Sequence, residues 1–247
     1  MTKTFFVTGT DTEVGKTAVS CALLEAAASA GLTTAAVKPV AAGCDDNDQN
    51  EDALQLMASM TAELEYQQVN PVALAPAIAP HIAAAQAGRN MKASQLAGLC
   101  QGVMMAGADL VLVEGAGGWR VPLSPRETLA DLARELNVGV ILVVGMRLGC
   151  INHALLTAEA IARDGLELVG WVANQPAERM SCHAENLDTL RQLLPAPLLG
   201  EIPLVQSIRE AGDVGRPAVL QNGTPLETAF LDVCRKVDEA MNAVPAE

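Results

Sequence analysis

Residues 9–17 read Gly9-Thr10-Asp11-Thr12-Glu13-Val14-Gly15-Lys16-Thr17 and match G-x-x-x-x-G-K-[ST], the pattern of a phosphate-binding loop. The apolar run at 5–7 precedes them and an apolar-periodic segment at 18–30 follows, which is the strand–loop–helix context that the pattern requires. Backbone N–H groups of such a loop bind anions. We expect Lys16 to reach the β- and γ-phosphates and the Thr17 hydroxyl to ligate Mg²⁺. An ordinary glycine-rich turn would not explain why a lysine and a hydroxyl end it together.

The remaining pattern predicts an α/β fold, a single-domain P-loop NTPase-like fold in which a mostly parallel sheet carries helices on both faces. We assign residues 1–247 to this one domain, with the tail at 211–247 least well defined. Strands are expected at 4–8, 33–40, 109–113, 139–144, 166–172 and 197–202. Helices are expected at 17–29, 51–59, 93–106, 129–136, 152–164, 184–194 and 226–241, and the proline-rich stretch at 69–81 is expected to be irregular.

Composition limits the partners and the compartment. Half of the 247 residues are apolar but only 2% are aromatic, so the core must consist of Ala, Val, Leu and Ile. The net charge of −13 argues against nucleic acid and against an anionic membrane surface as partners. The six cysteines form no C-x-x-C pair, and no secretory signal begins the chain. We therefore expect reduced thiols, no zinc site and a cytoplasmic location.

Charged residues follow two of the predicted strands, at the edge of the sheet where ligands bind in such folds. Glu114 ends the hydrophobic strand at 109–113 and precedes a glycine-rich run, as an acid that faces Mg²⁺ would. Lys38 follows the Ala-Ala-Val run at 35–37 and precedes Pro39, where a second lysine would hold the γ-phosphate and neutralise the charge that develops during transfer. From spacing alone, Asp52 is one acid among several and is expected to face solvent.

The turn Gly149-Cys150-Ile151-Asn152 lies between a predicted strand and a predicted helix. Its free N–H groups would bind an anion such as a carboxylate. A plain turn in which Asn152 caps the helix explains the same residues equally well.

Taken together, these segments resemble the dethiobiotin synthetase family. The likeness runs from about residue 4 to 210. Besides the P-loop run, the matching segments are Val37-Lys38-Pro39-Val40, Val113-Glu114-Gly115-Ala116-Gly117-Gly118-Trp119, Gly149-Cys150-Ile151-Asn152-His153-Ala154, Gly170-Trp171-Val172-Ala173-Asn174 and Pro195-Ala196-Pro197-Leu198-Leu199-Gly200-Glu201-Ile202-Pro203. The resemblance implies an ATP- and Mg²⁺-dependent ligase of biotin biosynthesis, which joins CO₂ to 7,8-diaminononanoate and closes the ring of dethiobiotin with release of ADP and phosphate.

The resemblance also implies roles for individual positions. As catalytic residues it implies Lys38, Lys16 and Thr12; as Mg²⁺ ligands, Thr17, Asp52 and Glu114. As residues around ATP it implies Glu13, Val14, Gly15, Lys16, Thr17, Ala18, Asp52, Glu114, Gly115, Ala116, Gly117, Asn174, Gln175, Pro203, Leu204, Val205 and Glu210. Around the diamine it implies Thr12, Lys38, Ala42, Gly149, Cys150, Ile151 and Asn152, the last four from the second subunit of a homodimer.

Two positions depart from the family pattern: Ala42 stands where a serine is usual, and Gln175 where an aspartate usually follows the asparagine. A paralogue acting on a related substrate therefore remains an alternative. So does a partition-type ATPase switch of the same fold, although those proteins carry a lysine at the position of Asp11. An amidotransferase-linked ligase would need a glutaminase domain, for which 247 residues leave no room.

Overall fold

The computed structural model describes residues 2–202 together with Thr228, Asp232 and Arg235. The strands are β1 (Lys3–Gly9), β2 (Thr34–Val37), β3 (Val40–Ala42), β4 (Val72–Leu74), β5 (Leu110–Gly118), β6 (Gly139–Gly145), β7 (Leu168–Asn174) and β8 (Leu198–Ile202). The helices are α1 (Lys16–Ser29), α2 (Glu51–Ser59), α3 (Tyr66–Val69), α4 (Pro80–Gln86), α5 (Ala93–Met104), α6 (Leu129–Leu136), α7 (Cys150–Arg163) and α8 (His183–Leu193). Apart from the three C-terminal residues just named, the helix predicted at 226–241 lies outside the described residues.

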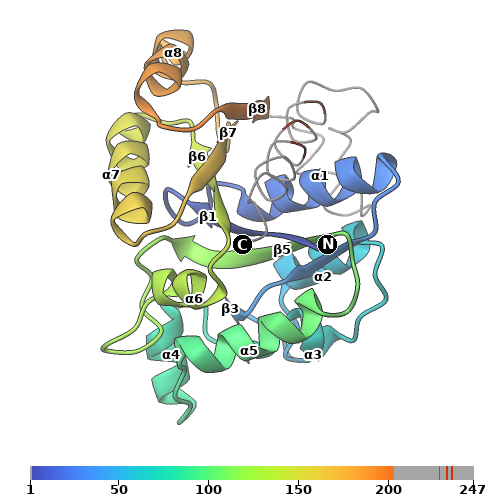
Figure 1. Cartoon of the computed structure of the whole chain (residues 1–247). Helices are drawn as coiled ribbons and strands as arrows, with labels where there is room; N and C mark the ends of the chain where they lie inside the picture. The colour runs from blue at the N-terminus through green and yellow to red at the C-terminus, as the bar shows by residue number, and fades with distance from the viewer. Residues whose placement is uncertain (1, 203–227, 229–231, 233–234, 236–247) are drawn as a thin grey trace, which may run out of the picture.

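Six strands form one parallel sheet in the order β2-β5-β1-β6-β7-β8. Strand β1 lies in its interior, between β5 and β6 (Figure 1). The chain passes from β1 to one side of the sheet and later returns to the other, so the loop after β1 lies where ligands bind in open α/β sheets. The predicted fold class is thereby confirmed.

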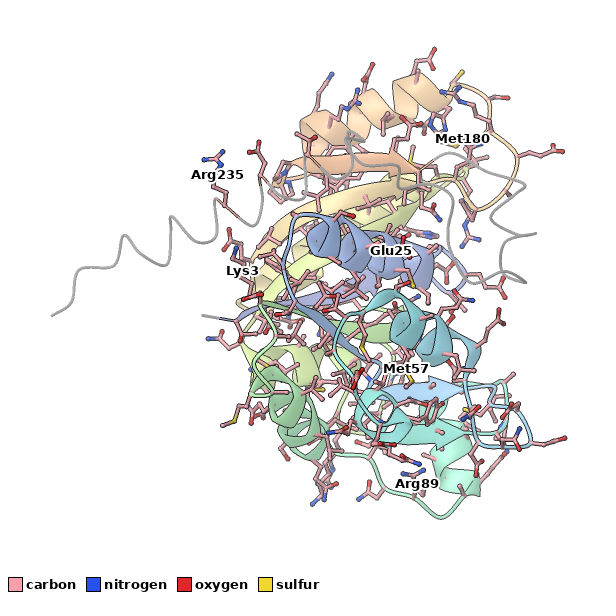
Figure 2. The ribbon with its side chains drawn as sticks, turned by 90° about the vertical axis from the view of Figure 1, so that its right-hand side faces the viewer. Lys3, Glu25, Met57, Arg89, Met180 and Arg235 are labelled. Atoms are coloured by element: carbon pink, nitrogen blue, oxygen red, sulfur yellow. The ribbon has the colours of Figure 1, made fainter. Side chains whose placement is uncertain are left out.

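Helices cover both faces of the sheet (Figure 1). Alternating residues of β1 show this directly. Phe5 belongs to the core cluster that contains Leu23 of α1, whereas Phe6 belongs to the cluster that contains Leu96 of α5 and Leu132 of α6. Helix α2 lies beside α1 (Figure 2). Ser59 Oγ of α2 donates to Glu25 Oε1 of α1 over 3.1 Å. Burial on both faces explains why the central strands are almost continuously apolar rather than alternating.

Two of the sequence predictions were wrong in the region between β2 and α4. The strand expected at 33–40 is divided, because β2 ends at Val37 and Pro39 has no N–H with which to continue a ladder. Strand β3 then pairs with β4 in a separate parallel ladder, with Val40 opposite Val72. The stretch at 69–81, expected to be irregular, contains β4 and the start of α4, where Pro80 occupies a first-turn position that proline tolerates.

Most other boundaries agree with the sequence to within two residues. The largest extension is in β5, which continues through the glycine run to Gly118 instead of ending at Val113. Within the described part of the chain, each helix is too short or too polar to cross a membrane.

Candidate active site

A cavity of about 730 Å³ opens beside the P-loop. Its wall combines the loop with the ends of β2 and β5, the start of α2 and the segment before α4. The residues that line it are Thr12, Glu13, Gly15, Lys16, Thr17, Lys38, Ala41, Ala42, Asn50, Asp52, Ala77, Ile78, Ala79, Pro80, Ala116, Gly117, Val121 and Pro122. The cavity wall therefore combines charged and hydroxyl-bearing residues with small aliphatic ones.

The P-loop is held in a conformation that depends on glycine. Gly15 has φ +85° and a Cβ there would lie 2.2 Å from Nδ2 of Asn174. That same Nδ2 donates to the carbonyl of Val14 over 2.7 Å. Asn174 is the last residue of β7, so the carboxyl end of this strand stabilises the P-loop through a hydrogen bond to its backbone. A larger residue at position 15 would be both strained and in collision.

Lys38 and Glu114 meet because of strand register. Val37 of β2 lies opposite Val113 of β5, so the next residue of each strand comes to the same edge of the sheet. Lys38 Nζ is 2.7 Å from Glu114 Oε1, and the side chains are 4% and 0% exposed. Thr17 Oγ1, on the first turn of α1, donates to the same Oε1 over 2.8 Å.

Asp52 completes the cluster from the first turn of α2. Its Oδ2 lies 2.5 Å from Lys38 Nζ, while 43% of its side chain remains exposed. The expectation that Asp52 faces solvent was thus only partly right, because its carboxylate is directed at the buried lysine. Sequence spacing could not reveal this, since the contact depends on how α2 packs against the end of β2.

The two lysines of the site differ in protonation behaviour. Burial, followed by the repulsion of Lys38, lowers the pKa of Lys16 more than the neighbouring carboxylates raise it. Burial also opposes the charge of Lys38, but Glu114 and Asp52 outweigh it and raise the pKa of this ammonium group. For Asp52, burial is outweighed by the Lys38 ammonium, which lowers the pKa of the carboxyl group. Lys38 therefore carries a firmly held positive charge at neutral pH.

The oxygen atoms of this cluster suit a hard divalent cation. Glu114 Oε2 is buried and has no hydrogen-bond partner, although its residue sits beside the Thr17 hydroxyl and near Asp52. An unpartnered buried carboxylate oxygen is costly unless something binds it. Among the described residues no group of three or more His, Cys, Asp or Glu side chains gathers to hold a metal. A cation here would therefore rely on two carboxylates, one hydroxyl and oxygens of its ligand.

The structure brings some of the predicted residues to the cavity and leaves others elsewhere. Those lining it are Thr12, Glu13, Gly15, Lys16, Thr17, Lys38, Ala42, Asp52, Ala116 and Gly117. Those that do not line it are Val14, Ala18, Glu114, Gly115, Asn174, Gln175, Gly149, Cys150, Ile151 and Asn152. Pro203, Leu204, Val205 and Glu210 lie outside the described residues. Glu114 and Asn174 contact residues of the cavity wall or the P-loop without lining the cavity themselves. Glu114 accepts hydrogen bonds from Lys38 and Thr17, and Asn174 donates to the P-loop backbone.

The turn before α7 differs from one of its two sequence interpretations. The helix begins at Cys150 with Gly149 as its N-cap at φ +98°. Asn152 is therefore inside the first turn and does not cap the helix, because Gly149, three residues earlier, is the N-cap and has the left-handed conformation. Next to this turn, Leu148 is 92% exposed.

Sequence reasoning missed several residues around the site. Arg147 forms an ion pair with Asp11, the position at which partition-type ATPases carry lysine. Asn50, Tyr66 and Asn70 form hydrogen bonds that reach the backbone of Lys38. Tyr66 and Asn70 are four residues apart, a spacing typical of one helix face, but Asn70 falls within the stretch at 69–81 that we predicted to be irregular.

The chain resembles known proteins over most of its length. A family profile described as an AAA domain matches residues 3–211. The ATP-dependent dethiobiotin synthetase BioD of Marinobacter nauticus is 54% identical over 230 residues, which cover 90% of this chain and 97% of that one. The protein of the same name from Cellvibrio japonicus is 59% identical over 204 residues, covering 81% and 89% of the two chains.

Among solved structures, the septum site-determining protein MinD of Pyrococcus horikoshii, in complex with Mg-ADP, aligns with a TM-score of 0.60. The alignment covers 98% of each chain at 21% sequence identity. At this identity the likeness establishes a shared P-loop ATPase fold and nothing further about activity.

Proposed function

The chain belongs to the ATP-dependent dethiobiotin synthetase family, and from this premise we propose how its cavity joins CO₂ to 7,8-diaminononanoate. It is an ATP-dependent ligase of biotin biosynthesis that forms C–N bonds. The observation that carries the proposal is that Lys16, Lys38 and Thr17 line one cavity together with apolar residues, among them Ala41, Ala77, Ile78, Ala79 and Val121. A triphosphate and an alkyl diamine require these two kinds of surface.

The reaction proceeds in three steps. A neutral amine of the diamine attacks CO₂ and, after losing a proton, becomes a carbamate. A carbamate oxygen then attacks the γ-phosphorus of ATP, which releases ADP and leaves a mixed carbamic–phosphoric anhydride. Finally the second amine attacks the carbonyl carbon, the C–O bond to phosphate breaks, and the cyclic urea forms. Each step creates or moves negative charge next to the γ-phosphate.

The proposed roles of the two lysines follow from this charge. Lys16 follows Gly15 in the loop and holds the β- and γ-phosphates. Lys38, held by two carboxylates, is presented as a fixed ammonium group to the carbamate and the transferred phosphoryl group. Preorganised charge of this kind stabilises a transition state without reorganisation during the reaction. Thr12 lines the same cavity on the diamine side of the loop.

We propose Mg²⁺ as the divalent cation, held by Thr17, Asp52 and Glu114. The unpartnered Oε2 of Glu114 and the oxygen-only donor set fit this ion. When bound, Mg²⁺ would neutralise charge on the β- and γ-phosphates. Lys38 shares the carboxylates of Asp52 and Glu114, so it also sets how much negative charge the cation meets.

We further propose that the protein acts as a homodimer. Gly149–Asn152 lie away from the cavity within their own chain, so they would reach a diamine carboxylate only from a partner subunit. The exposed Leu148 beside them is an apolar side chain that an interface would cover. Light scattering should give twice the mass of the chain, and Leu148→Asp should shift it towards the monomer. A monomeric parent protein would refute this arrangement.

Two assays test the activity. Purified protein with diamine, bicarbonate, ATP and Mg²⁺ should form dethiobiotin, detected by mass, together with one phosphate per ring. Omission of the diamine should reduce phosphate release to a small fraction. A rate of phosphate release that is the same with and without the diamine would instead indicate the switch-type ATPase. Phosphate release that requires a different, related diamine would indicate a paralogue.

A further inference from the structure

A chain of hydrogen bonds connects the helix that carries Asp52 to the backbone of Lys38. The N–H of Asn50 donates to Tyr66 Oη over 2.7 Å, and Tyr66 Oη donates to Asn70 Oδ1 over 2.9 Å. Nδ2 of Asn70 then donates to the carbonyl of Lys38 over 2.7 Å. We call Asn50, Tyr66 and Asn70 the Tyr66 relay. Tyr66 is the only tyrosine of the chain and stands at the centre of this relay.

The two ends of the relay are the two backbones that set the position of the Lys38–Asp52 ion pair. Asn50 is the N-cap of α2, two residues before Asp52. At the other end, the carbonyl of Lys38 accepts from Asn70 while its N–H donates to the carbonyl of Val69 over 2.7 Å. Both peptide groups of Lys38 are thus fixed by the same short segment that carries Tyr66.

Because the two asparagines of the relay are buried, water cannot easily replace the hydrogen bonds that Tyr66 makes to them. Asn70 is 2% exposed and Asn50 is 7% exposed. Lys38 follows β2 directly, and Pro39 prevents that strand from continuing, so the main sheet does not hold the lysine backbone beyond Val37. Without Tyr66 Oη, the N–H of Asn50 and Oδ1 of Asn70 would each lose a hydrogen-bond partner, and both of these residues are buried.

On the basis of the function proposed above, we propose that Tyr66 is a positioning residue of the reaction: its hydroxyl fixes the start of α2 against the end of β2, and so keeps Lys38 Nζ between Asp52 and Glu114. Tyr66 itself does not line the cavity. Its effect is transmitted through Asn50 on one side and Asn70 on the other. None of the three hydrogen bonds of the relay involves residues 9–17, so we expect the phosphate-binding loop to keep its conformation when the relay is broken.

A general structural role of α3 is the competing explanation, and the chain offers a matched control for it. The same helix has a capping box, in which Gln68 Oε1 accepts from the N–H of Glu65 over 2.8 Å. Gln68→Ala removes that hydrogen bond from α3 but leaves the relay intact. Tyr66→Phe removes only the hydroxyl and keeps the ring, so it breaks the relay and leaves the capping box in place, whereas Gln68→Ala does the reverse.

The experiment measures steady-state kinetics of the full-length parent, Tyr66→Phe and Gln68→Ala proteins with saturating diamine. We expect Tyr66→Phe to lower kcat about tenfold while KM for ATP stays within about twofold. Gln68→Ala should keep both constants within about twofold. Asn70→Asp keeps the acceptor for Tyr66 but loses the donor to Lys38, and should lower kcat similarly. The double variant Tyr66→Phe/Asn70→Asp should have a kcat close to that of the more impaired single variant, because both substitutions break the same chain of hydrogen bonds.

A crystal structure of Tyr66→Phe supplies a readout that does not depend on turnover. The Lys38 Nζ to Asp52 Oδ2 separation should increase from 2.5 Å to beyond hydrogen-bond distance. An unchanged separation, an unchanged kcat in folded Tyr66→Phe protein, or an equal loss in Gln68→Ala would each overturn the proposal. If the parent protein forms no dethiobiotin, the proposed function fails, and the crystallographic separation still decides whether Tyr66 positions Lys38.

Discussion

The ammonium group of Lys38 lies 2.7 Å from Glu114 Oε1, and 4% or less of either side chain is exposed. Taking two charges out of water costs about as much as their attraction returns, so a buried pair is a poor way to stabilise a fold. Here strand register brings the two residues to the edge of the sheet beside the P-loop, where the negative charge of a triphosphate would meet the lysine. The pair is therefore better understood as a charge held ready for the reaction than as a device for stability.

Replacing the lysine tests its role in the reaction. Lys38→Met keeps the length of the side chain and removes the charge, so kcat should fall by about 10²–10³-fold, as when a fixed donor to a transition state is removed. The free energy of unfolding should fall by about 3 kcal/mol, because Glu114 loses its buried partner. Steady-state kinetics and urea unfolding measure the two effects. Lys92→Met, at an exposed position, is the control, and a Lys38→Met protein with parental kcat would remove Lys38 from the mechanism.

Glu114 should control the response to magnesium. Glu114→Gln replaces a carboxylate by a neutral amide of the same shape, so the Mg²⁺ concentration at half-maximal activity should rise at least about tenfold, as a ligand charge is lost. Activity is measured across a magnesium titration at constant ATP. Glu63→Gln changes the same charge at an exposed site and should leave the titration in place. Coincident titrations of parent and Glu114→Gln protein would contradict the proposed metal site.

Gly15 in the P-loop and Gly31 after α1 allow the effect of backbone strain to be measured separately from the effect of a steric collision. Gly15 and Gly31 have φ +85° and +87°, but a Cβ at Gly15 meets Asn174 Nδ2 at 2.2 Å, whereas one at Gly31 meets nothing within 4 Å. Gly31→Ala should therefore lower the free energy of unfolding by only about 1 kcal/mol and leave ATP binding unchanged. Gly15→Ala should cost more and should abolish ATP binding measured by calorimetry. Normal ATP affinity in Gly15→Ala would show that the loop does not need this close approach.

The thiols should differ in reactivity according to burial. Burial raises the pKa of Cys21 and of Cys100 to about 12, so only about one thiol in ten thousand is ionised at pH 8. Cys182 is exposed. Brief treatment of the native protein with iodoacetamide at pH 8, followed by peptide mass spectrometry, should label Cys182 and leave Cys21 and Cys100 unmodified. Labelling of these two should appear after unfolding in urea, and rapid labelling in the native protein would contradict their placement.

Tyr66 provides a pH-dependent signal of its own. Burial raises its pKa above the usual value of 10.0. The folded state then holds the phenolic proton more tightly than the unfolded state, so the stability gained is present below pH 10 and is lost as the pH rises through the folded-state pKa. Absorbance at 295 nm follows this single tyrosine, and its midpoint should lie higher in native protein than in urea. Equal midpoints would place the hydroxyl in free solvent.

Much of this site was predictable because it depends on local patterns. The P-loop has a strict spacing, and both Lys38 and Glu114 directly follow apolar strands. The carboxyl ends of parallel strands meet at one edge of a sheet, so strand ends alone bring these groups near each other. Long central strands have the strongest pattern, which is why their ranges were predicted to within about two residues in most cases.

The remaining parts depend on tertiary packing that the sequence pattern does not encode. Strands β3 and β4 have three residues each, too few for a periodic signal, and prolines surround them. The contact of the Asp52 carboxylate with Lys38 depends on how α2 packs. The hydrogen bonds of the Tyr66 relay join residues up to 32 positions apart in the sequence. Neither contact leaves a mark in local periodicity.

The central claim is that the γ-phosphoryl group passes to a carbamate and not to water. Parent protein is mixed with diamine, ATP, Mg²⁺ and [¹⁸O]bicarbonate in unlabelled water, and the phosphate released in the first seconds is analysed by mass spectrometry. The mechanism predicts one ¹⁸O atom in each phosphate, because the carbamate oxygen that attacks phosphorus leaves with it when the ring closes. Phosphate without label, formed while the bicarbonate still carries it, would contradict the account.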